Sequence, residues 1–331
     1  MEQLKKYHEQ IKNEITTFFD EEIITKKEDL VIYEHLKEYA LRGKLIRGSL
    51  VLLINETLTE QKKEALTTAT ALEILHSAIL IIDDIIDEDE TRRGKPAMHI
   101  TTKELVNQSK NKNHDAQSIA QCTALIGTYT SYLKLSQTNS EILKQISQEF
   151  IKTGFAELNE VILAQKETVT EEDVMNIYKH KTAKYTITLP IKLGYILSKK
   201  EFTEELEQIT DNIGILFQIK DDLLELEENE EAIGKSNTSD IKAGKQHYPR
   251  KLLEKQANKE DLEIINKAYT SLTDEDVQTI QEMYKKYEIV QKTQKIIKEI
   301  EQETTNLIQK QEPKIQRIMQ ELLIYVTKRK Y

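Results

Sequence analysis

The stretch that decides the fold is residues 66–87, LTTATALEILHSAILIIDDIID. Its apolar residues fall in two interleaved rows, at positions 71, 74, 78, 81 and 85 and at positions 72, 75, 79, 82 and 86. Both rows have helical spacing, which predicts a helix with a wide apolar face that lies deep in a bundle. The predicted helix ends on three carboxylates, so one segment supplies both core and candidate site.

Further segments repeat this helical pattern, at 119–135, 141–164, 186–198, 205–226 and 276–308. Polar or glycine-containing connections separate them. The chain has nine glycines and four prolines, too few for the many turns of a β-rich fold. We therefore expect an all-α fold, a single-domain antiparallel helical bundle over residues 1–331 with ligand sites on facing helices.

Composition excludes several classes of protein. With 57 acidic and 47 basic residues the formal charge is −10, which argues against a nucleic-acid binder because such proteins usually present a basic face. The most apolar run, residues 78–82, is much shorter than the about 20 apolar residues that span a bilayer, so no transmembrane segment is expected. The charged first residues do not resemble a signal peptide, and the single cysteine, Cys122, fits a reducing compartment. These features predict a cytoplasmic protein.

A first acidic group closes the predicted helix. Asp83 and Asp87 are one turn apart and project side by side, and Asp84 lies between them. Closely packed carboxylates repel one another unless a cation neutralises them, and hard oxygen ligands suit Mg²⁺. The alternative is a solvated helix end in an acidic protein.

A second acidic group recurs in the segment 205–226. Gln218, Asp221 and Glu225 share one helical face, with Asp222 beside them. The repeat of an aspartate pair after an apolar run favours two carboxylate groups that hold several Mg²⁺ ions around a diphosphate. Cations flank both groups and suit phosphate binding: Lys44, Arg47, Arg92, Arg93, Lys181, Lys235 and Lys245.

Five segments together resemble the trans-prenyl diphosphate synthase family, which includes farnesyl and geranylgeranyl diphosphate synthases. They are 43–48 (GKLIRG), 73–94 (EILHSAILIIDDIIDEDETRRG), 181–190 (KTAKYTITLP), 217–226 (FQIKDDLLEL) and 234–245 (GKSNTSDIKAGK). The resemblance implies a helical bundle around a deep central cavity, a homodimer, and three Mg²⁺ ions shared with substrate diphosphate. It also implies an enzyme that condenses isopentenyl diphosphate head to tail with an allylic diphosphate.

The resemblance further implies roles for individual residues. Metal ligation falls to Asp83, Asp87 and Asp221, supported by Asp84, Asp222 and Glu225. The allylic diphosphate is assigned to Arg92, Lys181 and Lys235, and the diphosphate of isopentenyl diphosphate to Lys44, Arg47, His76 and Arg93. The remaining substrate-site residues are Thr182, Phe217, Gln218 and Lys245, of which Thr182 and Gln218 count as catalytic because they would face the allylic cation.

The sequence departs from the family pattern at three places. Glu225 ends the second acidic motif in place of the more usual aspartate, and Leu45 replaces a frequent arginine. Residues 154–159 (GFAELN) lack the glutamine and aspartate often found there, and the sequence leaves open whether Glu157 or Asn159 substitutes. The basic end, residues 328–331, is interpreted either as a tail that closes over the site or as a solubilising tail.

Product length follows from positions before the first aspartate, which form the pocket floor in the family. Ala78 and Ile79 occupy these positions, and the next bulky candidates are Leu75 and Leu72. The small Ala78 leaves space, and one helical turn of about 5.4 Å admits about one more isoprene unit, so we predict a C20 product. A C15 product is the alternative if Tyr129 or Tyr132 closes the pocket, and a longer chain also stays open. A class I terpene cyclase, a non-catalytic regulatory subunit of a prenyl synthase and a metal-free acidic scaffold are the more distant alternatives.

Overall fold

The computed structural model describes residues 3–25, 30–59, 63–164, 166, 168–226, 239–242 and 244–328. Over these residues the protein is helical apart from one short hairpin, in which β1 (Thr91–Arg92) pairs antiparallel with β2 (Lys95–Pro96). The predicted all-α class is confirmed. The chain divides into two compact units, Met1–Gln148 with Leu189–Phe202 (unit 1) and Glu149–Thr188 with Thr203–Tyr331 (unit 2), so a single domain stays a prediction.

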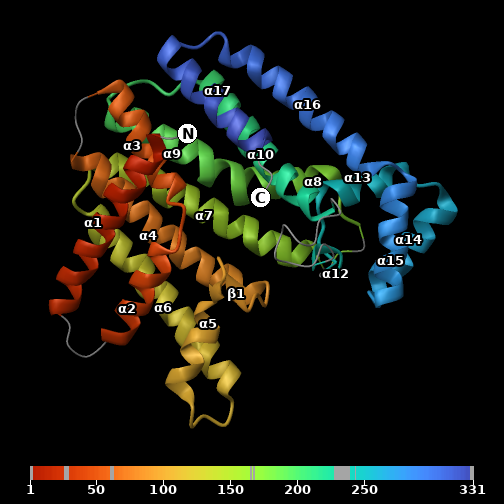
Figure 1. Ribbon diagram of the computed structural model, residues 1–331, viewed down its shortest axis with the longest axis horizontal. Coiled ribbons are helices and arrows are strands. Elements are labelled where there is room, and N and C mark those ends of the chain that lie inside the picture. Colours follow the sequence, from red (N-terminus) through yellow and green to blue (C-terminus); the bar gives the residue numbers. More distant parts are fainter. Residues whose placement is uncertain are drawn as a thin grey trace. The chain divides into compact units, whose positions relative to one another are not determined.

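Unit 1 is built around two long helices. Its elements besides the hairpin are α1 (Gln3–Thr25), α2 (Leu30–Leu41), α3 (Ile46–Leu58), α4 (Lys63–Ile86), α5 (Met98–Thr101), the 3₁₀ turn η1 (Thr102–Val106), α6 (Lys112–Leu135), the first part of α7 (Ser140–Leu163) and α9 (Leu189–Leu197). Helix α4 packs along α6 and against α3 (Figure 1). The close approach of α4 and α6 depends on Gly127, because a Cβ there would lie 3.3 Å from the Cβ of Ala78 and 3.1 Å from Leu36 Cδ1.

Helix α4 is apolar over a longer stretch than residues 78–82 indicated. By length and composition alone it is apolar enough to cross a membrane, but 72% of its most apolar window is buried inside the protein. Most of both apolar rows is therefore buried, as the interleaved pattern predicted, whereas Ile82 and Ile86 at the end of the helix are exposed. The expectation based on residues 78–82 underestimated the apolar length, because small buried residues such as Ala69 and Ala71 extend the apolar face toward the helix start.

Unit 2 surrounds α10. Its elements are the second part of α7, α8 (Glu171–Ile177), η2 (Tyr178–Thr188), α10 (Glu204–Leu226), α12 (Ser239–Lys242), α13 (Tyr248–Gln256), α14 (Lys259–Ser271), α15 (Asp274–Lys286), α16 (Ile289–Ile308) and α17 (Pro313–Thr327). Helices α16 and α17 pack on α10 (Figure 1). Buried side chains of α12–α16 form an apolar cluster. Residues 276–308, which one apolar pattern covers, form two helices because Glu288 takes a left-handed conformation (φ 54°) between them.

The segment η2 is a π-helix of 11 residues. Such helices are rare and frequently occur at functional sites. It lies directly on α10, where a Cβ at Gly214 would be only 2.4 Å from the Cα of Ala183. Gly214 is therefore required for this contact, which places Thr182 beside Gln218 of α10.

Candidate active site

The first acidic group has one buried and two more accessible carboxylates. Asp84 is completely buried, Asp83 is half-buried and Asp87 is exposed. Asp84 accepts hydrogen bonds from the hydroxyl of Tyr39 and the guanidinium of Arg92. Burial raises the pKa of the Asp84 carboxyl, and Arg92 opposes this effect. Asp84 is thus an anchored carboxylate, whereas its neighbours remain accessible to a ligand.

Arg92 is presented by the hairpin. Arg93 (φ 57°) and Gly94 (φ 71°) form the two-residue turn, and positive φ at both positions matches a type I′ turn. Arg92 also contacts Asp83, at 2.8 Å between Nη2 and Oδ2, and Asp89, at 3.4 Å. Burial lowers the pKa of Arg92, but the adjacent Asp84 and Asp83 outweigh it and raise the pKa above its ordinary value. The hairpin therefore fixes a permanent cation on the acidic group.

The start of α3 is capped by a residue from α4. Leu45, which precedes α3, has a left-handed backbone (φ 48°) and no capping side chain. The N–H of Gly48 instead donates to Oε1 of Glu73 at 2.7 Å. Glu73 is only 2% exposed, and burial raises the pKa of its carboxyl while Arg47 opposes the shift. This cap joins the basic motif of residues 43–48 to the helix that carries Asp83.

Arg47 of α3 and His76 of α4 lie together. Nη1 of Arg47 is 2.9 Å from Nε2 of His76. Burial lowers the pKa of His76 well below its usual value, and Arg47, Arg93 and Arg92 lower it further. The imidazole is therefore neutral at pH 7, and its Nε2 accepts from Arg47. Lys44 is exposed at the start of the same motif, and Arg93 lies beside Gly43.

The second acidic group repeats the construction of the first. Asp222 is buried and accepts hydrogen bonds from the hydroxyl of Tyr178 and from Nε2 of Gln218 at 2.9 Å, and Asp221 beside it is half-buried. The Gln218 Oε1 in turn accepts from Thr182 Oγ1 at 2.7 Å. Both ends of the Gln218 amide are thus held in this network. Phe217 precedes Gln218 on α10 and is half-buried.

Lys181 is paired with two glutamates of α7. Its Nζ lies 3.0 Å from Oε2 of Glu157 and also contacts Glu160. Of the two candidates that the sequence left open, Glu157 reaches this lysine, whereas Asn159 lines a neighbouring pocket. Lys245 is half-buried in unit 2, after a turn at Gly244. Lys235, the side chain of Glu225 and residues 329–331 lie outside the described residues.

The positions expected to set product length lie in the interior of unit 1. Leu72, Leu75 and Ala78 are buried, and Ile79 is partly buried. Ala78 faces Gly127 of α6, with Leu36 adjacent. The two tyrosines proposed to close the pocket lie elsewhere. Tyr129 is 68% exposed on the outer face of α6. The hydroxyl of Tyr132 donates a hydrogen bond to Ser147.

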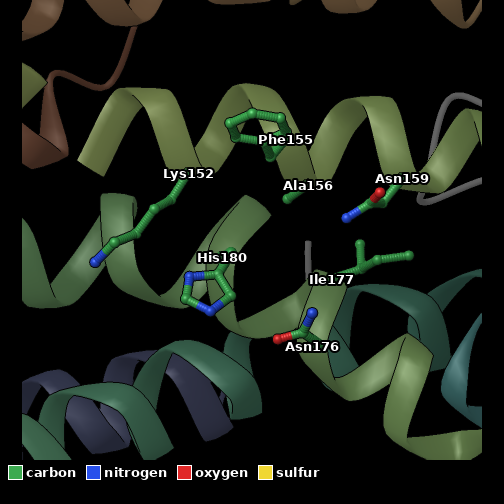
Figure 2. A pocket seen from close by; sticks show the side chains of 7 residues that line it. All are labelled: Lys152, Phe155, Ala156, Asn159, Asn176, Ile177 and His180. Atoms are coloured by element: carbon green, nitrogen blue, oxygen red, sulfur yellow. The ribbon is translucent and has the colours of Figure 1, made fainter. Parts of the chain in front are cut away.

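A small pocket in unit 2 was not foreseen. Its volume is about 160 Å³, and Figure 2 shows that α7, α8 and η2 line it. The lining residues are Lys152, Phe155, Ala156, Asn159, Asn176, Ile177 and His180. Burial, followed by Lys152 and Lys179, lowers the pKa of His180, which is adjacent in sequence to Lys181. Of the candidate residues that the sequence offered, Asn159 lines this pocket.

The donor chemistry of the acidic groups fits Mg²⁺. Among the described residues, no three His, Cys, Asp or Glu side chains gather closely enough to hold a metal ion by themselves. Mg²⁺ is usually bound by one or two carboxylates, with water and substrate phosphates completing its octahedron. Asp83 and Asp87, one turn apart and accessible, match that pattern in unit 1. In unit 2, Asp221 is a carboxylate of the same donor type.

Comparison with known proteins decides the family. A polyprenyl synthetase profile matches residues 30–287. The chain belongs to the polyprenyl synthetase family. It is 30% identical over 269 residues to the farnesyl diphosphate synthase of Bacillus subtilis (strain 168), which covers 76% of this chain and 90% of that protein. It is 29% identical over 252 residues to geranylgeranyl pyrophosphate synthase 10 of Arabidopsis thaliana, covering 75% and 72%.

The fold of this synthase also matches solved structures. The geranylgeranyl pyrophosphate synthase of Corynebacterium glutamicum, crystallised with isoprenyl diphosphate and magnesium, has a TM-score of 0.87 at 22% identity and covers 98% of this chain and 99% of that one. The protein is thus a trans-prenyl diphosphate synthase, a transferase, as the five motifs indicated. Farnesyl and geranylgeranyl synthases match equally well, so the family does not fix the product.

Sequence reasoning missed the residues that hold the site in place. Tyr39 and Tyr178 anchor the two buried aspartates, Glu73 caps α3, and Glu160 contacts Lys181. The tyrosines and Glu73 lie on elements whose pairing the sequence does not specify. Glu160 had a signal, because it lies three residues after Glu157 and so on the same side of α7.

Proposed function

We propose that this synthase joins isopentenyl diphosphate head to tail to allylic diphosphates and that its product is all-trans geranylgeranyl diphosphate. The observation that supports the reaction most is the shared construction of the two aspartate pairs. Each has a buried aspartate bonded to a tyrosine hydroxyl and an accessible aspartate beside it. Such preorganised carboxylates suit ions that bridge to a diphosphate.

Asp83, Asp87 and Asp221 would hold Mg²⁺, and we propose three ions shared with the substrate diphosphate. When bound, the metal would supply Lewis-acid stabilisation of the charge on the departing diphosphate. Asp84 and Asp222 each accept a hydrogen bond from a tyrosine hydroxyl. We propose that these bonds fix the backbone that carries the accessible aspartates. Glu225 completes the proposed set.

Arg92 and Lys181, with Lys235, would bind the allylic diphosphate, and Lys245 is a further residue proposed to bind substrate diphosphate. Arg92 and Lys181 are paired with carboxylates, and phosphate oxygens of the substrate would replace those partners. Lys44, Arg47, His76 and Arg93 would bind the diphosphate of isopentenyl diphosphate. The neutral His76 directs its Nε2 to Arg47 and so holds that guanidinium in place.

The proposed reaction needs no enzyme nucleophile. The allylic C–O bond breaks and its electron pair leaves with the diphosphate. The double bond of isopentenyl diphosphate then attacks the allylic cation, and the diphosphate accepts the proton that is lost. The carbonyl oxygens of Lys181 and Thr182 in η2 and the amide of Gln218 are the groups proposed to face the cation, since oriented dipoles stabilise developing charge without reorganisation.

The C20 product is proposed from the side chains around Ala78 of α4. Its support is the small side chain of Ala78, with Leu75 and Leu72 about one and two turns before it in α4. Leu36 borders the same position, so it would share the floor. A C15 or a longer product is the alternative within the same reaction.

Product analysis tests both parts of this proposal. Purified protein is incubated with labelled isopentenyl diphosphate, dimethylallyl diphosphate and Mg²⁺, with and without EDTA. We expect a C20 product that EDTA abolishes, and we expect Ala78→Phe to shorten it by one isoprene unit. A C15 product from the natural sequence contradicts the Ala78 argument alone, whereas no elongation contradicts the reaction.

We also propose a homodimer that works in the cytoplasm. Support comes from large apolar side chains exposed along one row of α6, at Leu125, Tyr129 and Leu133. A second exposed row follows α7, at Ile151, Phe155, Leu158 and Ile162. Continuous apolar rows of this kind are typical of surfaces that a second copy covers.

A further inference from the structure

Lys245 lies in a short turn whose backbone is fixed at both ends. Residues 244–247, the Lys245 turn, begin at Gly244, which has φ 65° and donates its N–H to the carbonyl of Ile241 at 2.9 Å. They end at His247, the N-cap of α13, whose Nδ1 accepts from the N–H of Arg250 at 3.2 Å. Lys245 therefore sits between two anchors that are three residues apart.

Arg250 binds the turn directly. Its Nη1 donates to the carbonyl of Gly244 at 2.7 Å and approaches the carbonyl of Lys245 at 3.4 Å. The side chain is only 8% exposed, although arginine is seldom buried without a specific partner. Its Nε donates to Glu254 at 2.8 Å, and the guanidinium lies 3.5 Å from the centre of the Tyr269 ring. This buried cation thus points one guanidinium nitrogen, Nη1, at the main-chain oxygens of Gly244 and Lys245.

A second contact ties the same turn to the acidic group of α10. The N–H of Tyr248, the first residue of α13, donates to the hydroxyl of Tyr178 at 2.7 Å. That hydroxyl in turn donates to Asp222. The start of α13 and the second aspartate pair are therefore held by one tyrosine, so the position of the Lys245 turn is fixed relative to the carboxylates of unit 2.

We propose that Arg250 is a positioning residue for substrate binding, because it holds the backbone from which Lys245 reaches the diphosphate. This inference rests on the proposed function, in which Lys245 binds a substrate diphosphate. A planar guanidinium can bind a carboxylate, an aromatic face and a carbonyl at once, whereas a lysine ammonium at this position cannot reproduce that geometry. The alternative is that Arg250 only stabilises the packing of α13 on α14.

A double-mutant cycle separates these two roles. The full-length protein and its Arg250→Met, Lys245→Ala and combined variants are titrated with inorganic pyrophosphate and Mg²⁺ by calorimetry, and their KM for dimethylallyl diphosphate is measured beside kcat. We expect Arg250→Met to weaken pyrophosphate binding about tenfold, which corresponds to about 1.4 kcal/mol. In the Lys245→Ala background, Arg250→Met should weaken pyrophosphate binding by less than about twofold, because the side chain that Arg250 positions is absent.

Two further variants sharpen the comparison. Arg250→Lys keeps the charge and should fail to restore binding. Lys255→Met removes a positive charge from the same helix, where the well-exposed Lys255 pairs with Glu171, and it should leave binding unchanged. If Arg250→Met does not fold, Tyr269→Leu or Glu254→Gln takes its place in the cycle, because each removes one contact of the Arg250 guanidinium.

The outcomes distinguish this inference from the proposed function. A natural protein that neither binds pyrophosphate nor elongates an allylic diphosphate overturns both. If the natural protein is active but the Arg250 and Lys245 effects multiply independently, Arg250 has only a structural role and the inference is overturned. The same holds if Lys245→Ala leaves binding unchanged.

Discussion

Tyr39 and Tyr178 donate hydrogen bonds to the buried aspartate of each acidic pair. A buried carboxylate without partners would lose much of its hydration energy, so these hydroxyls allow Asp84 and Asp222 to lie inside the protein. Burial raises the pKa of Tyr39, and the nearby Asp84 raises it further, so the hydroxyl remains a donor. The accessible aspartates are thus supported by neighbours that a motif search does not reveal.

Removing either hydroxyl should weaken both fold and site. We expect Tyr39→Phe or Tyr178→Phe to lower the free energy of unfolding by about 1–3 kcal/mol, because a buried acceptor loses its donor. Urea denaturation measures this loss, and the Mg²⁺ concentration for half-maximal activity should rise. Tyr129→Phe, on an exposed ring, is the control and should change neither quantity. Unchanged Mg²⁺ dependence in both buried variants would count against the anchoring role.

A second prediction concerns the pH dependence of stability, to which His76 contributes. Burial and the adjacent arginines lower its pKa, so below about pH 6.5 the unfolded chain protonates this ring while the folded protein does not. The unfolded state then binds more protons, and stability falls as pH falls. We expect the natural protein to lose more stability than His76→Gln between pH 7.5 and 5.5, by up to about 1.4 kcal/mol per pH unit. His99 and His180, whose pKa values are also lowered, remain in both proteins. Equal losses would contradict a neutral His76.

At the scale of elements, periodicity located most helices well. The rows at 119–135, 141–164 and 205–226 correspond to α6, α7 and α10, since spacing along one helix is a local property. The break at Glu288 escaped prediction because the apolar rows continue on both sides of it. The π-helical form of η2 escaped for another reason: it depends on its packing against α10 at Gly214.

For the site too, residues close in sequence could be predicted, whereas contacts between different helices could not. Asp83, Asp87 and Arg92 follow from residues close in sequence, and Arg92 does meet the first acidic group. Contacts such as Glu73 with Gly48, or Tyr178 with Asp222, join different helices and follow only from the packing of unit 1 or unit 2. Periodicity therefore predicts which residues share a face, and the fold decides which faces meet.

Gly214 tests the contact between α10 and η2. A Cβ there would lie 2.4 Å from the Cα of Ala183, so Gly214→Ala must push η2 away from α10. We expect a loss of about 1–3 kcal/mol in the free energy of unfolding together with a fall in kcat, since Thr182 and Gln218 separate. Gly154→Ala on α7 is the matched control, because nothing lies within 4 Å of its added Cβ. That change should be neutral or stabilise the helix by up to about 1 kcal/mol. Equal effects at the two positions would contradict the packing argument.

At the scale of the whole molecule, the exposed apolar rows predict the oligomeric state. Sedimentation should give a mass about twice 38.5 kDa for the natural protein. Phe155→Glu combined with Leu158→Lys places charges on the α7 row and should shift the mass toward one copy. Lys298→Glu, on the polar part of α16, is the control. A natural protein that sediments as a single chain at micromolar concentration would rule out the proposed dimer.

The central part of the proposed function is that the carboxylates of both acidic groups serve the same reaction. The most direct measurement is the rate of Mg²⁺-dependent condensation for Asp83→Asn, Asp221→Asn and the double variant. Each single change should lower kcat by about 100- to 1,000-fold, the range seen when one preorganised electrostatic group is removed. If the two groups act as a unit, the double variant should be less than about tenfold slower than the slower single variant. Losses that multiply in full, or a single variant with natural activity, would contradict the claim.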